Sequence, residues 1–367
     1  MPWLPRTLPF KDWPDDARYL PIERIIELYG DGFAGAKHDP EADERFKSSM
    51  MFPSGDAAAQ QFGLADTGAG KLIVPFVYVQ EMFPGCWPGP AQEIGDCVSH
   101  STQNACLTTL ACDVVSGQLD ETTGKPEEKP DVPPEGIKQG VLSSEAFYWY
   151  RGYDGDGWSC PDAATVAVKQ AGAVLRKNYA DLGIDLTTYS GRLAHKYGRN
   201  EPPSNIGGEL HRHPVHQATN CESLESVRDM LHSGYGVSTC GGEGYSDTRD
   251  DNGVSKQRGS WSHAMGAIGF DDRDWAKQTY GVPLVLILNS WAVWNGGPRE
   301  IHDSAKNVPP DKLDLWKQLG ICSANGSILI PEGSFWTPWN HAKNREFIAF
   351  SGVNGWPVRS LPLDNYF

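Results

Sequence analysis

The chain reads Gln92-Glu93-Ile94-Gly95-Asp96-Cys97-Val98-Ser99-His100-Ser101 at the point where a loop gives way to a helical pattern. After this stretch, apolar residues recur at helical spacing as far as Val115, and Gly117 follows as a stop signal. The pattern predicts one helix over residues 97 to 116. Cys97 therefore lies in its first turn, where the positive end of the helix macrodipole favours a thiolate over a thiol.

Two later segments supply the other side chains that a reactive thiol needs. Ser262-His263-Ala264 precedes an apolar run, and Leu288-Asn289-Ser290-Trp291 ends another. His263 would exchange a proton with Cys97 and later protonate the leaving group, while Asn289 would orient the imidazole ring. Gln92 and the backbone N–H of Cys97 are candidates to stabilise the oxyanion of acyl transfer.

Each of these residues also has a simpler interpretation. Cys97 considered alone would be assigned to the core, because free cysteines are among the most buried residues. His263 alone fits a hydrogen-bonded core histidine, and Asn289 alone fits a turn. Their joint presence, in this order and in these local settings, favours a nucleophile with an acid–base partner and an orienting amide.

At these residues the chain resembles the papain-like cysteine peptidases. That family has Gln before Gly and Cys, later His-Ala before a strand, and later Asn-Ser-Trp-Gly. Further segments are similar to the family in the same order: Leu142-Ser143-Ser144-Glu145, Gly157-Trp158-Ser159-Cys160 with residues 163 to 174, and residues 223 to 238.

The resemblance implies an α+β, papain-like two-lobed fold, with a helical lobe, a β-barrel-like lobe and N- and C-terminal extensions. It implies hydrolysis of peptide bonds in a peptide or protein substrate through a thioester on Cys97, with no cofactor. It also makes Gly157 and Trp158 candidates for binding substrate in the cleft. Trp291 is a third candidate, although packing over Asn289 is the simpler role for it.

Several positions depart from the family's pattern, which indicates a distant member. The family commonly has Cys-Gly-Ser-Cys-Trp, whereas this chain has Asp96 before the cysteine, Val98 after it, and Ala292 after Trp291. Gln92 lies one residue closer to the cysteine than usual. Asp96 places a carboxylate beside the nucleophile, which would raise the pKa of Cys97 unless the side chain points away.

Composition excludes several classes of function. A net charge of −15 argues against nucleic acid as a partner. No apolar run approaches the ~20 residues of a membrane span, and residues 1 to 6 lack the apolar region of a signal peptide. We therefore expect a cytoplasmic protein whose eight cysteines are mostly free thiols.

Two clusters invite a metal interpretation, and neither has a complete ligand pattern. His211, His213 and His216 surround a proline, with no carboxylate or cysteine joining them before Cys221. The acidic segment 154 to 157 lacks the terminal glutamate of a calcium loop. We expect no bound metal.

Proline spacing and periodicity divide the chain into four parts. Residues 1 to 90 form an extension that wraps the core, 91 to 205 the helical lobe with the nucleophile, 206 to 297 the β lobe with His263 and Asn289, and 298 to 367 a C-terminal extension completing the β lobe. Predicted helices lie at 22 to 29, 143 to 150, 162 to 171 and 312 to 319, and predicted strands at 71 to 80, 236 to 240, 264 to 270, 284 to 288 and 326 to 330. The N-terminal extension does not resemble the family's inhibitory domain, so we expect it to pack on the lobes without filling the cleft.

Three functions fit the sequence. The leading hypothesis is a cysteine-type peptidase. An amidase or peptidoglycan hydrolase would use the same triad, and the sequence does not separate it from a peptidase. The third hypothesis is a papain-like domain within a structural protein, such as a phage virion component, whose extensions bind an assembly partner and which would be virion-associated.

Overall fold

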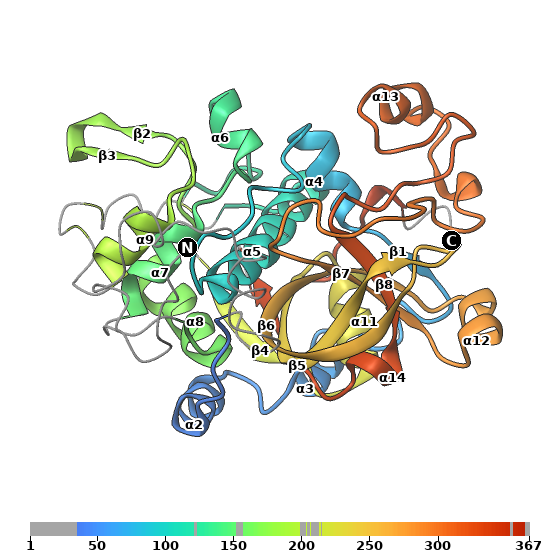
Figure 1. Ribbon diagram of the computed structural model, residues 1–367, viewed down its shortest axis with the longest axis horizontal. Helices are drawn as coiled ribbons and strands as arrows, with labels where there is room; N and C mark the ends of the chain where they lie inside the picture. Colours follow the sequence, from blue (N-terminus) through green and yellow to red (C-terminus); the bar gives the residue numbers. More distant parts are fainter. Residues whose placement is uncertain are drawn as a thin grey trace, which may run out of the picture.

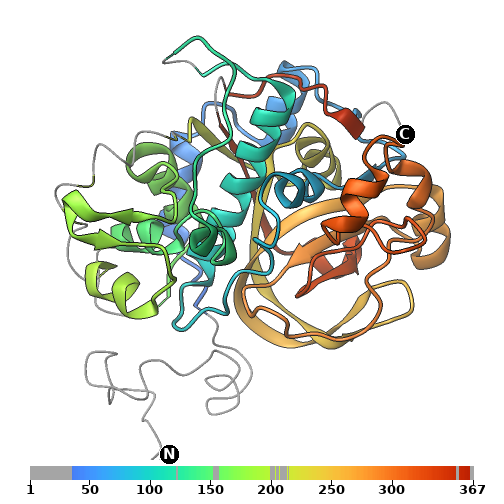
Figure 2. The same ribbon diagram turned by 90° about the horizontal axis from the view of Figure 1, so that it is seen from above.

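The computed structural model describes residues 35–120, 123–151, 157–198, 203, 206, 213, 215–352 and 355–363. One long helix, α5 (Cys97–Ser116), runs through the middle of the molecule (Figure 1). Shorter helices gather on one side of α5, and a twisted antiparallel sheet lies on the other side, as the view from above also shows (Figure 2). The predicted α+β, two-lobed arrangement is confirmed.

The first lobe is built mainly from short helices around α5. They are α6 (Pro134–Lys138), α7 (Ser144–Tyr148), α8 (Cys160–Val166) with a π-helical turn at Ala167–Ala171, and α9 (Gly191–Gly198), with a small hairpin of β2 (Asn178–Tyr179) and β3 (Ile184–Asp185). Serine side chains start two of these helices, because Ser143 and Ser159 each accept a backbone N–H of the first turn.

The second lobe is a sheet in the order β4-β9-β5-β6-β7-β8, with β1 paired to β6. Its strands are β1 (Leu72–Ile73), β4 (Gln217–Asn220), β5 (Gly236–Arg249), β6 (Ser255–Asp271), β7 (Leu284–Leu288), β8 (Ser334–Pro338) and β9 (Glu346–Ser351). The strand order begins at β4 and ends at β8 without the two pairing, so the described strands form an open sheet. The predicted β-barrel-like lobe is therefore a curved sheet that does not close. Helices α11 (Leu224–His232), α12 (Asp274–Tyr280), α13 (Leu313–Gln318) and α14 (Trp339–Ala342) surround it.

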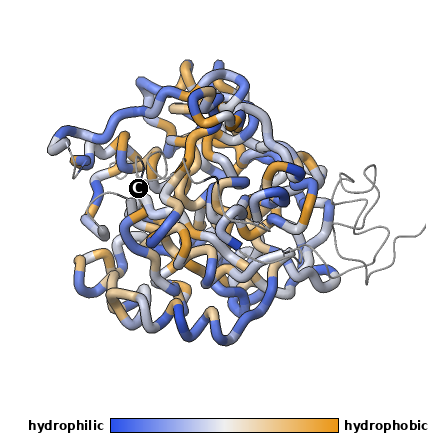
Figure 3. The backbone as a smooth tube through the Cα atoms, turned by 90° about the vertical axis from the view of Figure 1, so that its left-hand side faces the viewer, coloured by the Kyte–Doolittle hydropathy of each residue, from blue (hydrophilic) through white to orange (hydrophobic). Residues whose placement is uncertain are grey.

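The two lobes meet where α5 packs on the centre of the sheet. Gly236 of β5 permits this approach, because a Cβ there would lie 1.9 Å from the carbonyl oxygen of Ala105. Ser101 and Thr109 on α5 donate to the carbonyls of Met265 and Phe350. The tube coloured by hydropathy shows apolar segments concentrated inside and polar segments outside (Figure 3). This junction fixes the position of the first turn of α5 relative to β6.

Residues outside the resemblance are integral to both lobes. In the N-terminal part, α2 (Pro40–Ser49) packs on α8 and α3 (Gly55–Gln61) packs on α11. Phe46 and Leu64 are buried there. From the C-terminal part, β8 and β9 each pair with a strand of the central sheet. No helix in the described ranges combines the length and the apolar character needed to cross a membrane.

Two predicted strands are wrong and one predicted helix cannot be compared. Residues 71–80 hold only the two-residue β1, after which Pro75 precedes the helix α4 (Phe76–Met82), since a proline fits the start of a helix better than a strand interior. Residues 326–330 make isolated bridges only, and the strand beside β7 is β8 instead. The helix predicted at 22 to 29 lies outside the described residues.

Candidate active site

Cys97 is the first residue of α5, as its pattern predicts. Its side chain is fully buried, and α5 spans twenty residues from Cys97 to Ser116. The unpaired N–H groups of a helix start carry partial positive charge, which stabilises an anion at this position. The sulfur is therefore placed where a thiolate is favoured.

The sulfur of Cys97 touches the strand that carries His263. The backbone N–H of Ala264 donates to Cys97 Sγ at 3.4 Å, although the two residues are 167 positions apart in the chain. Ala264 in turn pairs with Cys240 across β5 and β6, so its amide is held by the sheet. An N–H directed at sulfur also stabilises negative charge there.

Asn289 holds the imidazole of His263. His263 Nε2 donates to Asn289 Oδ1 at 2.7 Å, because an amide oxygen can only accept. The contact arises from β6 and β7, which pair at Gly266 and Leu288 so that His263 and Asn289 project from neighbouring strands. This bond fixes Nε2 as the protonated nitrogen and assigns proton exchange with a thiol to Nδ1. The structure thus joins His263 to Asn289 through their side chains and places the Cys97 sulfur against Ala264, the residue after His263.

Trp291 covers the His263 ring rather than standing apart from it. The two rings stack with centroids 4.6 Å apart and an interplanar angle of 24°, and Trp261 and Trp294 pack around Trp291. Trp291 is nearly buried. It shields the bond between His263 and Asn289 from water, and a role in substrate binding stays a prediction.

Gln92 connects the loop before α5 to Ser290, the residue after Asn289. Its side-chain oxygen accepts from Ser290 Oγ, and its backbone N–H donates to the Ser290 carbonyl at 2.9 Å. Its amide nitrogen donates to the Ile94 carbonyl at 2.8 Å. Gln92 therefore ties the loop before α5 to the residue after Asn289, and its predicted part in an oxyanion hole stays a prediction.

Asp96 directs its carboxylate into the helical lobe. It makes no side-chain cap bond to α5, and Tyr189 donates its hydroxyl to Asp96 Oδ2 at 2.8 Å. His100 Nε2, one turn along α5, lies 3.6 Å from the same oxygen. The sequence pattern did not single out His100 or Tyr189. The spacing of Asp96 and His100 by four residues on one helix was the available signal.

Residues 35–37 run between the two lobes, near Gly95 in the loop before Cys97. Trp158 donates to the Gly35 carbonyl at 2.7 Å, Lys37 donates to the Trp158 carbonyl at 2.7 Å, and Ala36 donates to the Ser262 carbonyl at 3.0 Å. Ala36 and Trp158 form a parallel bridge. The segment thus joins the residue before His263 to the strand that was predicted to bind substrate.

This placement needs glycine on both sides of the contact. Gly35 has φ +103°, and a Cβ on it would lie 2.3 Å from the carbonyl oxygen of Gly95. A Cβ on Gly157 would lie 2.6 Å from the Gly35 carbonyl oxygen. Residues 35–37 therefore pair with backbone groups of both lobes. The expectation that the N-terminal extension packs on the lobes without filling the cleft stays a prediction.

Gly157 and Trp158 contribute backbone to this contact, not side chain. The Trp158 ring is buried in the main core. Its N–H and carbonyl are bonded to Gly35 and Lys37, and an extended peptide could pair with the same backbone groups in their place.

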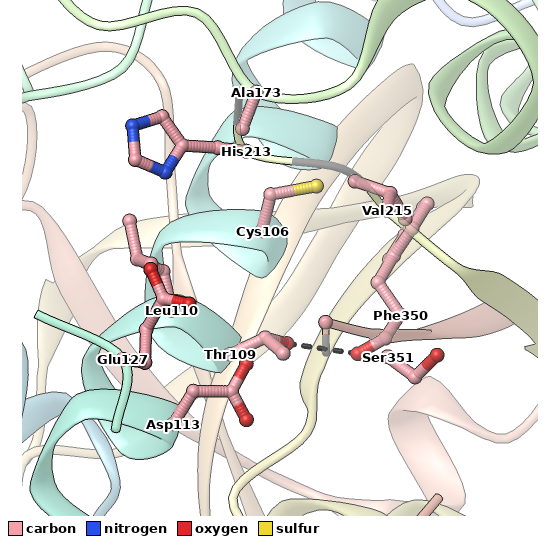
Figure 4. A pocket seen from close by; sticks show the side chains of 11 residues that line it. Cys106, Thr109, Leu110, Asp113, Glu127, Ala173, His213, Val215, Phe350 and Ser351 are labelled. Carbon is pink, nitrogen blue, oxygen red and sulfur yellow. Dashed lines mark hydrogen bonds between the residues drawn. The ribbon is translucent and has the colours of Figure 1, made fainter. Parts of the chain in front are cut away.

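Cys86, Cys106 and Cys221 lack a comparable setting. Burial raises the pKa of Cys86 and Cys106 far above the ordinary thiol range, and burial raises that of Cys221 to about 12. Cys106 faces a cavity of about 30 Å³ on the side of α5 that carries Asp113, with Glu127 and His213 also in its wall (Figure 4). These thiols stay protonated at neutral pH, which separates them from the nucleophile position.

The two metal candidates acquire no support. His213 lines the cavity of Figure 4, while His211 and Asp154 to Asp156 lie outside the described residues. In the described part of the chain, no three His, Cys, Asp or Glu side chains gather as metal ligands would.

No family model and no curated protein sequence matches the chain. Among solved structures, the chain is similar to xylellain, a cysteine protease from Xylella fastidiosa, at 14% identity and a TM-score of 0.39, covering 74% of this chain and 86% of that one. It is also similar to proCathepsin B S9 from Trypanosoma congolense at 12% identity and a TM-score of 0.37, covering 90% and 96%. A third similar structure is digestive procathepsin L 3 of Tenebrio molitor larval midgut, at 10% identity and a TM-score of 0.35, covering 87% and 94%. All three similar structures are cysteine proteases or their proforms, matched at low identity and low TM-score.

Proposed function

We propose that this protein is a cysteine-type peptidase that hydrolyses peptide bonds through a thioester on Cys97. One observation carries the proposal: Cys97 Sγ contacts the N–H of Ala264, next to the His263 ring that Asn289 holds through Nε2. A buried histidine and a buried thiol could each be structural. The contact of Cys97 with the strand of His263, together with the bond from His263 to Asn289, supports the assignment of a nucleophile and its base.

The proposed reaction proceeds in two stages. The Cys97 thiolate attacks the carbonyl carbon, and protonated His263 passes its Nδ1 proton to the departing amine as the C–N bond breaks. Water then attacks the thioester with His263 as base, which releases the acid and restores Cys97. The N–H at the start of α5 would stabilise the oxyanion in both stages.

Residues 35–37 bear on how substrate would bind. They occupy the backbone N–H and carbonyl of Trp158, which an extended substrate would use in the same way. We therefore infer that this segment leaves the contact before a peptide is cleaved.

The test is labelling with a peptidyl epoxide, followed by mass-spectrometric mapping of the modified residue and by assays on an unstructured protein and on peptidoglycan. We expect label on Cys97, loss of cleavage in Cys97→Ala, and unchanged cleavage in Cys106→Ala, a matched buried thiol on the same helix. Full cleavage by Cys97→Ala would refute the assignment. Cleavage of peptidoglycan alone would favour the amidase instead.

A further inference from the structure

A buried cluster of ionisable groups lies directly behind the nucleophile. Asp96 and His100 flank Cys97 on the first turn of α5, and Tyr189 packs on both of them. Asp96 is fully buried, and His100 and Tyr189 are each 5% exposed. A charge in such a place is weakly screened by water, so its state affects its neighbours strongly.

The contacts bring Asp96 and His100 together from one helix and fix them from another segment. His100 Nε2 lies 3.6 Å from Asp96 Oδ2, and the Tyr189 hydroxyl donates to that same oxygen at 2.8 Å. The Tyr189 oxygen also accepts the Glu93 N–H at 3.0 Å, and its ring meets the His100 ring edge-on at 5.0 Å. Burial, followed by the charge of Asp96, raises the pKa of Tyr189 well above its ordinary value. Tyr189 is therefore a fixed donor to Asp96.

The groups around this pair are mostly acidic. Glu145 forms a fully buried ion pair with Arg176 at 3.0 Å, and Ser144 Oγ lies 3.4 Å from His100 Nε2. Burial raises the pKa of Glu93, and the charge of Asp96 acts in the same direction. Arg176 is already matched by Glu145. His100 is thus the side chain of this cluster that can be either neutral or positively charged.

His100 also borders the far side of the triad. A cavity of about 20 Å³, with room for about one water, is lined by His100 together with Asn289 and Ser290. The charge of His100 therefore faces Asp96 on one side and the residue that orients His263 on the other.

We propose that Asp96 and His100 form a proton-sensitive positioning pair that sets how readily Cys97 ionises. When His100 is protonated, it neutralises Asp96, and the dipole of α5 acts on the thiolate alone. When His100 is neutral, the Asp96 carboxylate remains at the helix start and opposes a second negative charge on Cys97. The inference rests on the proposed role of Cys97 as nucleophile. It adds His100, in addition to His263, as a second histidine that affects the ionisation of Cys97.

The experiment follows the ultraviolet absorbance of the Cys97 thiolate against pH, taken as the difference between each protein and its own Cys97→Ser counterpart. This readout needs no substrate, so it is independent of whether the protein cleaves peptides. Asp96→Asn should lower the apparent pKa of Cys97 by about one unit, because a like charge is removed. His100→Gln should raise it, because Asp96 then keeps its charge at every pH above its own titration.

The double variant separates coupling from two unrelated effects. In an Asp96→Asn background, His100→Gln should change the Cys97 titration much less than it does alone, because the carboxylate that His100 faces is then absent. His232→Gln serves as a matched control, since His232 is a buried histidine that contacts Lys71 instead. It should leave the curve unchanged.

Circular dichroism and thermal unfolding establish that each variant is folded. Superimposable Cys97 titration curves for wild type, Asp96→Asn and His100→Gln would overturn the proposal. If Asp96→Asn does not fold, His100→Gln alone still decides, because an unshifted curve contradicts the pairing. A shifted curve in a protein that cleaves no peptide would support this pair and reject the proposed peptidase.

Discussion

Arg345 donates from Nη2 to the carbonyl oxygen of His263 at 2.7 Å. The same guanidinium donates to Thr239 Oγ1 and to the Glu243 carbonyl, and it forms an ion pair with the Glu243 carboxylate at 3.5 Å. A residue just before β9 thus holds the β6 strand at His263. The sequence analysis missed Arg345, because an isolated arginine far along the chain carries no local signal.

We predict that Arg345→Lys lowers both stability and activity. A lysine cannot reproduce the planar fork of donors, so buried acceptors lose partners worth about 1.5–3 kcal/mol each. Urea unfolding should show a loss of about 2–4 kcal/mol, and peptide cleavage should fall even at temperatures where the variant is folded. Arg299→Lys, at a more exposed ion pair with Glu332, is the control and should change little.

Asn289→Ala should weaken cleavage without removing it. Asn289 orients the His263 ring and forms no bond to substrate, so the loss should be at least about tenfold but smaller than the ~10²–10⁴-fold that removal of the acid–base itself produces. The kcat/KM values of Asn289→Ala and His263→Ala on one peptide make the comparison. Equal rates for wild type and Asn289→Ala would exclude Asn289 from the triad.

Removal of residues 1 to 37 should make Cys97 more reactive. Residues 35–37 are held by three backbone hydrogen bonds, each worth about 0.5–1.5 kcal/mol net. Their removal should therefore speed alkylation of Cys97 about tenfold or more. Gly35→Ala should act in the same direction, because its Cβ meets Gly95. Gly63→Ala is the matched control: Gly63 also has positive φ but has open space around it. Equal alkylation rates for wild type, the truncated protein, Gly35→Ala and Gly63→Ala would contradict the prediction that residues 35–37 cover Cys97.

Removal of residues 1 to 70 should instead destabilise the protein. This larger deletion also takes away Phe46 and Leu64, which are buried against the lobes. Each fully buried large apolar side chain contributes about 1.5–3 kcal/mol, so unfolding should shift by several kcal/mol. Thermal unfolding of the two truncated proteins tests the contrast, and equal stability would show that the helices α2 and α3 contribute little.

Glu127 should make stability depend on pH. Burial, together with the charges of Asp120 and Asp113, raises its pKa to about 7 in the folded protein from an ordinary 4.5. The folded state therefore holds the proton more tightly, so this contribution is complete below about pH 4.5 and is lost as pH rises through 7. Glu127→Gln should be more stable than wild type at pH 8 by on the order of 1 kcal/mol, a value reduced for partial exposure, and equal to it near pH 4. Urea unfolding at both pH values checks this, with the exposed Glu128→Gln as the control. The same stability difference between Glu127→Gln and wild type at pH 4 and at pH 8 would contradict the prediction.

The sequence by itself determined the elements whose signals are local. The helix 97 to 116 and its end at Gly117 follow from spacing and from a residue that adopts positive φ without strain, and the strand 284 to 288 follows from one apolar run. The order of Cys97, His263 and Asn289 also lies in the sequence, because each residue has a recognisable immediate setting.

Tertiary structure alone decided how distant segments pair. The direction of the Asp96 carboxylate depends on Tyr189, the cleft contact of Gly35 depends on Trp158 and Gly95, and the choice of β8 over residues 326–330 depends on which segment reaches β7. Backbone pairing and buried polar contacts join residues more than forty positions apart in each case. Their energies depend on which groups share a desolvated space, and that arrangement exists only once the chain has folded.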